Sequence, residues 1–153
     1  MSAVLRPDPW IQPLTEDDLE AVVAVERAIY EFPWTLGNFR DSLAAGYSCW
    51  GVHSGDGLIG YAVMMLGANE AHLLNLSVAA PVQRRGHGGR LLEHALRVAR
   101  GYHARVIFLE VRPSNPAARR LYLRYGFQQV GLRKGYYPAR RGREDALLFS
   151  LVL

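Results

Sequence analysis

The chain has 153 residues, of which 50% are hydrophobic and 21% are charged. This balance excludes a disordered chain and predicts one folded domain over residues 1–153. The net charge of +4 would suit nucleic acid or a small polyanionic cofactor. No arginine run is long enough to favour nucleic acid, because the densest, Arg140-Arg141-Gly142-Arg143, is typical of a solvated turn. We therefore expect no nucleic-acid partner.

Compartment and redox chemistry follow from what the sequence lacks. Cys49 is the single cysteine, so no intrachain disulfide is possible, and its apolar surroundings predict a buried structural thiol. Residues 1–8 lack the apolar core of a signal peptide, and no apolar run approaches the ~20 residues that span a bilayer. The five histidines show no metal-ligand spacing with carboxylates or cysteine. We expect a cytoplasmic protein with no membrane partner and no metal.

The first half of the chain predicts a strand, two helices and a three-strand meander. A strand at residues 10–14 precedes Thr15, which is predicted to cap a helix whose apolar residues recur at helical spacing. Phe32-Pro33-Trp34 interrupts the chain before a second helix at 35–45. The meander strands are expected at residues 48–53, 58–66 and 71–78, with turns at 54–57 and 67–69.

The second half predicts two helices and three strands. The helices are expected at residues 88–103 and 117–125, on either side of a strand at 106–111. Because that strand is apolar on both faces, it should be central in the sheet. Final strands at 127–134 and 145–153 flank a predicted loop containing Tyr136-Tyr137-Pro138. The order β-α-α-β-β-β-α-β-α-β-β implies an α/β fold with a mixed sheet and helices on both faces.

A glycine-rich loop at residues 83–89 stands where the helix at 88–103 begins. Its sequence, Gln-Arg-Arg-Gly-His-Gly-Gly, follows a buried strand. Helix N-termini carry unpaired N–H groups and a partial positive charge, and glycines allow close approach of a ligand, so the loop could hold a pyrophosphate. It is not a Walker A loop, because no Gly-Lys-Ser/Thr follows, and it is not a dinucleotide fingerprint, because Leu91 stands where the third glycine should be. An ordinary tight turn is the alternative.

Glu110 is the only ionisable residue in the apolar segment 106–111. A buried carboxylate is unfavourable unless it is partnered or used in chemistry. One interpretation is a structural ion pair with one of the many arginines. The other is a general base.

Several motifs together resemble one enzyme family. The strand, Gln83-Arg-Arg-Gly-His-Gly88 and the following helix resemble the Gln/Arg-x-x-Gly-x-Gly/Ala motif of the GCN5-related N-acetyltransferases (GNAT). Residues 109–127, Leu-Glu-Val-Arg-Pro-Ser-Asn-Pro-Ala-Ala-Arg-Arg-Leu-Tyr-Leu-Arg-Tyr-Gly-Phe, resemble the second half of that core. Phe32-Pro-Trp34, Tyr136-Tyr-Pro138 and Gly142-Arg-Glu-Asp145 resemble the bacterial ribosomal-protein alanine N-acetyltransferases of the RimI type. The resemblance spans nearly the whole chain.

The resemblance implies the GNAT acyltransferase fold and acetyl-CoA as the acetyl donor. The strand residues Leu76, Ser77 and Val78 would pair through their backbone with the pantetheine arm, and Asn115 would hydrogen-bond the cofactor or cap the next helix. Backbone amides would bind the pyrophosphate along the loop at Arg84, Arg85, Gly86, His87, Gly88 and Gly89.

The resemblance also assigns the chemistry. Glu110 would be the general base and Tyr122 the general acid that protonates the departing CoA thiolate, whereas Tyr125 would be core. Direct transfer is expected, because Cys49 lies away from the motifs. The implied acceptor is the N-terminal alanine of a small-subunit ribosomal protein. Aromatic residues that could form the wall of a peptide groove are Phe32, Trp34, Tyr136 and Tyr137.

Two alternatives remain open at this point. The same fold could acetylate a lysine side chain or a small-molecule amine, or it could be a non-catalytic acyl-CoA-binding module. The presence of both Glu110 and Tyr122 argues against the second. The sequence leaves the oligomeric state open.

Overall fold

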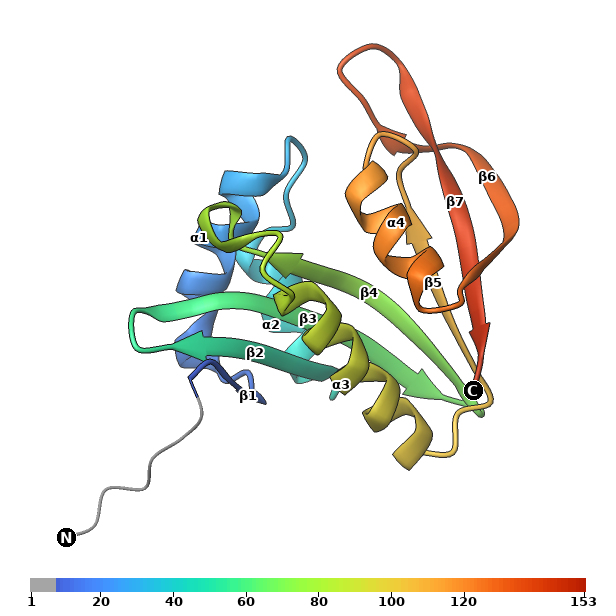
Figure 1. The fold of residues 1–153 in the computed structure, drawn as a ribbon. Coiled ribbons are helices and arrows are strands. Elements are labelled where there is room, and N and C mark those ends of the chain that lie inside the picture. The colour runs from blue at the N-terminus through green and yellow to red at the C-terminus, as the bar shows by residue number, and fades with distance from the viewer. Residues whose placement is uncertain (1–7) are drawn as a thin grey trace, which may run out of the picture. The chain divides into compact units, whose positions relative to one another are not determined.

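The structure is a computed structural model that describes residues 8–153, so the signal-peptide prediction concerns a segment almost wholly outside the described residues. The order of helices and strands predicted from the sequence is confirmed, with two short 3₁₀ helices in addition (Figure 1). The elements are β1 (Trp10–Pro13), η1 (Glu16–Asp18), α1 (Leu19–Ile29), α2 (Leu36–Ala44), β2 (Ser48–Ser54), β3 (Gly57–Gly67), β4 (Glu70–Val78), η2 (Ala80–Val82), α3 (His87–Gly101), β5 (Val106–Val111), α4 (Pro116–Arg124), β6 (Gln128–Pro138) and β7 (Arg143–Val152).

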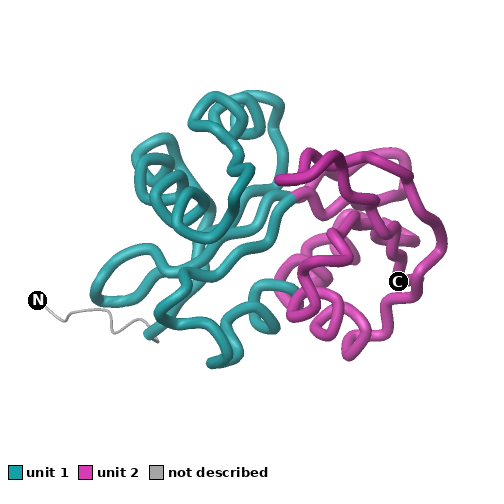
Figure 2. The backbone as a smooth tube through the Cα atoms, turned by 90° about the horizontal axis from the view of Figure 1, so that it is seen from above, with its two compact units in different colours: residues 1–63, 75–92 teal, residues 64–74, 93–153 magenta. Residues whose placement is uncertain are grey.

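The strands form one mixed sheet in the order β1-β2-β3-β4-β5-β7-β6. β4 and β5 pair in parallel, whereas β5 with β7 and β6 with β7 pair antiparallel. The described chain divides into two compact units, each of which includes part of the sheet (Figure 2). Unit 1 comprises residues 8–63 and 75–92, and unit 2 comprises residues 64–74 and 93–153.

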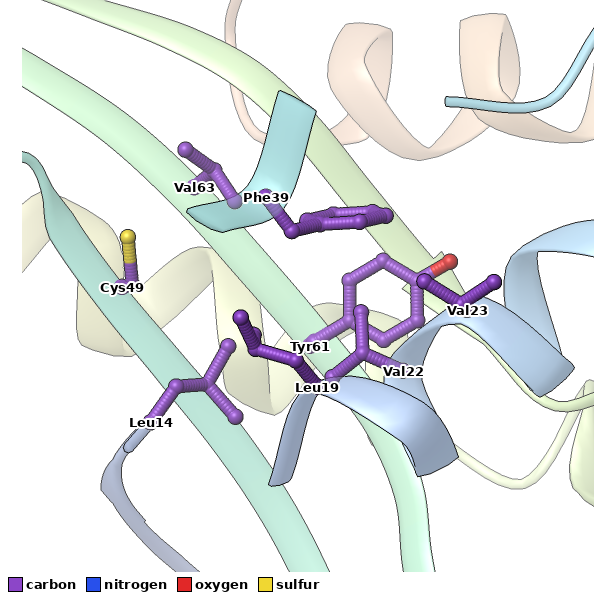
Figure 3. Close-up of a cluster of buried hydrophobic side chains, with 8 residues drawn as sticks. All are labelled: Leu14, Leu19, Val22, Val23, Phe39, Cys49, Tyr61 and Val63. Atoms are coloured by element: carbon purple, nitrogen blue, oxygen red, sulfur yellow. The ribbon is translucent and has the colours of Figure 1, made fainter. Parts of the chain in front are cut away.

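The core of unit 1 is built by α1, α2 and the strands that they cover (Figure 3). Tyr61 and Val63 of β3 pack in this core with Leu19 and Phe39, and the intervening Gly60 faces the opposite way, toward Leu91 of α3. Because successive side chains of a strand alternate between its faces, helices cover both faces of β3, as predicted. The buried side chains of the cluster are Leu14, Leu19, Val22, Val23, Phe39, Cys49, Tyr61 and Val63.

β5 is central in the sheet, as its apolar sequence predicts. It lies between β4 and β7, and its side chains at Ile107, Leu109 and Val111 are buried. After β5 the chain turns into α4, whose N-terminus is capped by Asn115: the Asn115 Oδ1 accepts a hydrogen bond from the Ala118 N–H at 3.2 Å. The N-cap interpretation of Asn115 is therefore confirmed.

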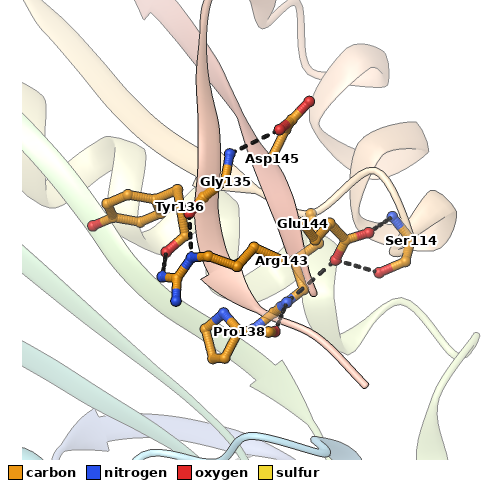
Figure 4. A network of polar contacts seen from close by, with 8 residues as sticks. Ser114, Gly135, Tyr136, Pro138, Arg143, Glu144 and Asp145 are labelled. Carbon is orange, nitrogen blue, oxygen red and sulfur yellow. Dashed lines mark hydrogen bonds and ion pairs between the residues drawn. The ribbon is translucent and has the colours of Figure 1, made fainter. Parts of the chain in front are cut away.

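The predicted loop at Tyr136-Tyr137-Pro138 is wrong, because these residues belong to β6. Tyr137 pairs with Glu144 and Pro138 with Arg143, so the turn lies after Pro138. The register shifts between Arg133 and Tyr137, and side chains of β7 bind the irregular backbone there (Figure 4). Arg143 donates to the carbonyls of Gly135 and Tyr136, and the Asp145 carboxylate accepts from the Gly135 N–H at 2.9 Å.

Among residues 8–153, no helix combines the length and the apolar character needed to cross a membrane.

Candidate active site

The glycine-rich loop of unit 1 leads directly from β4 into the N-terminus of α3. The Gly86 carbonyl accepts the first helical hydrogen bond, from the Arg90 N–H at 3.1 Å, so the N–H groups of His87 and Gly88 have no acceptor within the helix. Gly86 adopts φ +88° and an added Cβ would meet no atom within 4 Å, so open space lies beside its backbone. This arrangement can bind an anion through the main chain.

Contacts within unit 1 fix the loop at both of its ends. The Gln83 side-chain amide donates to the Val78 carbonyl at 2.9 Å, which holds the start of the loop against the end of β4. Arg90 donates to the Pro9 carbonyl at 3.3 Å. Arg84 and Arg85 are exposed, and Arg84 has a left-handed backbone with φ +63°. The side chains thus hold the loop's shape, and its amides carry the anion-binding capacity.

Strand β4 has the geometry expected of a strand that receives an extended ligand. Its parallel pairing with β5 runs from Glu70 opposite Val106 to Leu73 opposite Leu109, whereas β4 itself continues to Val78. Backbone groups beyond Leu73 therefore extend past the β5 ladder. Leu76 and Val78 are half-buried and Ser77 is buried.

The close packing of α3 on these strands depends on Gly60. A Cβ at this position would lie 3.0 Å from the Ser77 carbonyl oxygen and 3.4 Å from Leu91 Cδ1. A side chain here would push α3 away from β4, so Gly60 helps to set the distance between the first turn of α3 and the strand.

In unit 2, Glu110 is half-buried on β5 rather than fully buried as the sequence predicted. Its side chain is 24% exposed, and its carboxylate forms an ion pair with the Arg133 Nε at 3.2 Å. The ion pair with an arginine, which the sequence left open as an alternative, is therefore present. The Arg133 side chain is 57% exposed. An ion pair with a partner this exposed to water contributes little to stability.

The structure brings both predicted tyrosines of β6 to the surroundings of Glu110. Arg133 lies 5.4 Å from the Tyr136 ring centroid, and the Tyr136 and Tyr137 rings meet edge to face with centroids 5.0 Å apart. Burial, and then the negative charge of Glu110, raise the pKa of Tyr137 to about 12. Tyr137 is therefore a neutral hydroxyl near the carboxylate at neutral pH.

Arg112 and Glu144 hold this part of β6 in place, a role that the sequence did not assign to them. Arg112 lies 4.2 Å from the Tyr137 ring centroid and donates to the Pro138 carbonyl and to Glu144. Glu144 also accepts from the backbone and hydroxyl of Ser114 (Figure 4). Partial burial alone would raise the pKa of Glu144, but hydrogen bonds from Ser114 and Arg112 hold it below its ordinary value.

Tyr122 of α4 and Tyr125, which follows the helix as its C-cap, differ in burial. Tyr122 is buried, 7% exposed, with its ring against Phe127 at a centroid distance of 5.6 Å. Tyr125 was predicted to be core, which is wrong: it is only half-buried, and its hydroxyl donates to Glu93 at 2.6 Å. That hydrogen bond raises the pKa of Tyr125.

A second carboxylate, Glu26 in unit 1, is buried at 2% exposure and was missed from the sequence. It accepts hydrogen bonds from the Tyr61 hydroxyl, the Asn75 side chain and the Trp34 backbone N–H. The signal was available, because Glu26 follows Leu19, Val22 and Val23 at helical spacing, on the apolar stripe of α1. An acid on such a stripe must find donors inside the protein.

The predicted aromatic residues of unit 1 divide into one exposed and one packed side chain. Phe32 is 42% exposed, whereas Trp34 packs on the core with its ring 5.2 Å from that of Phe39. The predicted buried thiol is confirmed: Cys49 lies in the core, and burial raises its pKa to about 11. Among the described residues, no group of three or more His, Cys, Asp or Glu could hold a metal ion.

Comparisons with known proteins agree with these features. The sequence matches the acetyltransferase (GNAT) family over residues 13–127. The ribosomal protein bS18-alanine N-acetyltransferase of Escherichia coli (strain K12) is 33% identical over 143 residues, covering 94% of this chain and 97% of that protein. N-alpha-acetyltransferase RimI of Mycobacterium tuberculosis is 38% identical over 131 residues, covering 81% of each protein.

Structural similarity extends over the same length. The crystal structure of the ribosomal-protein-S18-alanine N-acetyltransferase from Escherichia coli matches with a TM-score of 0.88 and 33% identity, covering 94% of this chain and 93% of that one. The resemblance stated from the sequence motifs is thus confirmed, and the chain belongs to the acetyltransferase (GNAT) family and is an N-acetyltransferase.

Proposed function

We propose that this enzyme transfers the acetyl group of acetyl-CoA to the α-amine of a protein N-terminus, with the N-terminal alanine of a small-subunit ribosomal protein as its acceptor. The observation that carries the proposal is the half-buried Glu110 carboxylate beside Tyr136 and Tyr137. The acceptor class is supported by relatives named for ribosomal protein bS18 alanine acetylation. A ribosomal acceptor also implies action in the cytoplasm.

The described residues fit acetyl-CoA as the donor. The N-terminus of α3 and the open backbone at Gly86 suit a pyrophosphate, bound by the amides of residues 84–89. β4 continues beyond its ladder with β5, so residues 76–78 offer backbone groups to the pantetheine arm. Asn115, which already caps α4 through its Oδ1, would use its amide nitrogen to hydrogen-bond the donor.

In the proposed reaction Glu110 acts first. Its carboxylate removes a proton from the acceptor ammonium, directly or through water, and so frees the lone pair that attacks the thioester carbonyl. A backbone N–H of β4 polarises that carbonyl. As the carbon–sulfur bond breaks, Tyr122 donates its phenolic proton to the thiolate and is later reprotonated from water. The acylated nitrogen releases its second proton to water, and the products are the acetylated amine and CoA.

The proton chemistry favours an α-amine as the acceptor. An α-ammonium has an ordinary pKa near 8 and a lysine near 10.4, so neutralising lysine at neutral pH requires roughly 3 kcal/mol more. A single carboxylate base is better matched to the smaller requirement. The exposed aromatic side chains of Phe32 and Tyr136, with Trp34 and Tyr137, are proposed to contact the acceptor peptide.

We also propose that residues 1–153 act as one N-acetyltransferase domain. The family match over residues 13–127 includes parts of both units, and β3, β4 and α3 each contribute residues to both.

The test is incubation of the purified enzyme with acetyl-CoA and two peptides, followed by mass spectrometry. One peptide carries a free N-terminal alanine, and the other has the same sequence with a blocked N-terminus and an internal lysine. We expect acetylation of the first alone. Acetylation of the lysine peptide with no change in the alanine peptide would overturn the proposed acceptor.

A further inference from the structure

The buried carboxylate of Glu26 accepts three hydrogen bonds, and none of its donors is charged. Its Oε1 accepts from the Tyr61 hydroxyl at 2.6 Å and from the Asn75 amide at 3.0 Å. Its Oε2 accepts from the Trp34 backbone N–H at 3.0 Å. Within residues 8–153, Glu26 has no ion pair with a cation. An apolar side chain could fill this buried position without hydrogen-bond donors. The presence of a carboxylate with three donors therefore suggests a role beyond packing.

The network continues from Glu26 to the strand that is proposed to hold the donor. The Asn75 Oδ1 accepts from the Ser77 hydroxyl at 2.7 Å, and the Ser77 and Tyr30 hydroxyls are hydrogen-bonded at 2.6 Å. Burial raises the pKa of Tyr30, so its phenol remains a neutral donor or acceptor. The chain of contacts therefore begins on α1, passes through β4 and returns to the end of α1.

The two oxygens of Glu26 bind different parts of unit 1. Oε1 binds side chains of β3 and β4, which are regular strands. Oε2 accepts from the backbone N–H of Trp34. This residue belongs to the aromatic segment, residues 30–34, which lies between α1 and α2 and is neither helix nor strand. Glu26 thus connects a segment without regular hydrogen bonding to a rigid part of the sheet.

We propose that Glu26 is a positioning residue that holds the aromatic segment in the conformation needed to bind the acceptor. The segment displays Phe32 at 42% exposure, and its Trp34 backbone is fixed by the Glu26 carboxylate. Glu26 acts through the segment and touches neither substrate. This inference rests on the proposed function, because it assigns the segment to acceptor binding.

The experiment compares two variants that break different halves of the network. Glu26→Gln keeps the size of the side chain but places an amide nitrogen among the donors, so Oε1 and Oε2 contacts cannot all be kept. Tyr61→Phe removes one donor to Oε1 and leaves the Trp34 N–H with its acceptor. Glu20→Gln, an exposed acid on the same helix, is the matched control.

The first readout is hydrogen exchange of the Trp34 amide. In the wild type this amide should be protected from exchange. In Glu26→Gln its exchange rate should rise about tenfold or more. In Tyr61→Phe and Glu20→Gln the amide should stay protected. Exchange of the wild-type Trp34 amide at the rate of an exposed loop would overturn the proposal without any variant.

The second readout separates binding of the two substrates. We expect Glu26→Gln to raise the KM for the alanine peptide about tenfold and to leave the KM for acetyl-CoA within about twofold. Tyr61→Phe and Glu20→Gln should keep the wild-type peptide KM. Equal losses of thermal stability in Glu26→Gln and Tyr61→Phe, with an unchanged peptide KM in both, would show a purely structural role and refute the proposal. Failure of the wild type to acetylate the peptide would instead refute the proposed acceptor. The exchange measurement would still test whether Glu26 holds the Trp34 backbone.

Discussion

Two carboxylates of this protein, Glu26 and Glu110, show how surroundings decide what an acid can do. Glu26 is 2% exposed and its oxygens are occupied by three neutral donors, two from strands and one from the aromatic segment. The Glu110 side chain is 24% exposed and is paired with Arg133, whose side chain is 57% exposed. A carboxylate that is buried and accepts hydrogen bonds from several elements holds structure together. One that is partly exposed and has a single exposed partner is open to a substrate, which is the basis for proposing Glu110 as the base.

The largest expected effect comes from removing the base while keeping its shape. Glu110→Gln should lower kcat by about 10²–10⁴-fold, the usual contribution of a positioned general base. Steady-state rates with acetyl-CoA and the alanine peptide measure this. Because Arg133 is exposed, we expect the urea midpoint of the variant to stay close to that of the wild type. Wild-type turnover in Glu110→Gln would assign the carboxylate to the ion pair alone.

For Glu26 the comparison predicts a large loss of stability on substitution, whereas for Glu110 it predicts a large loss of kcat. Glu26→Ala leaves the Tyr61 hydroxyl, the Asn75 amide and the Trp34 N–H without their buried acceptor. We expect the free energy of unfolding to fall by roughly 3 kcal/mol, against less than about 1 kcal/mol for Glu110→Ala. Urea denaturation of both variants measures the difference. Equal losses of stability would remove the distinction between the two acids.

The proposed general acid can be tested with a matched pair of tyrosines, Tyr122 of α4 and Tyr125 at its C-cap. Tyr122→Phe should lower kcat about 10- to 100-fold if its phenol protonates the leaving thiolate. The control, Tyr125→Phe, removes a hydroxyl that donates to Glu93 and should keep near wild-type turnover. Similar rates in both variants would return Tyr122 to its alternative role, a core ring packed against Phe127.

The sequence predicted the order of elements because periodicity and turn residues are local signals. The strand at 106–111 has the bounds predicted, since its apolar run is uninterrupted. The end of β6 was not predictable in the same way. Gly135 and Pro138 suggest a loop, but the irregular strand there is held by Arg143 across the β6–β7 turn and by the more distant Arg112.

The partner of Glu110 could not be chosen from the sequence either, because 18 basic residues compete for it. Sheet register makes the choice. Glu110 pairs with Leu148 on β7, and Leu148 pairs with Gly131 on β6, so Arg133 lies two positions along on the same face. Glu26, by contrast, carried a local signal on the apolar stripe of α1. Its three donors come from separate elements, and these only the fold could identify.

The smallest predicted effect concerns Glu144, an acid intermediate between the other two. Hydrogen bonds from Ser114 and Arg112 outweigh its partial burial and lower the pKa of Glu144 in the folded protein. Since the folded pKa lies below the unfolded one, the stabilisation is complete above about pH 5 and is lost as the pH falls through the folded pKa. Urea midpoints between pH 7 and pH 3 measure this for the wild type and for Glu144→Gln. The advantage of the wild type at neutral pH should shrink as the solution is acidified. A constant difference would mean that the β6–β7 pairing, rather than the charge on Glu144, holds the two tyrosines beside Glu110.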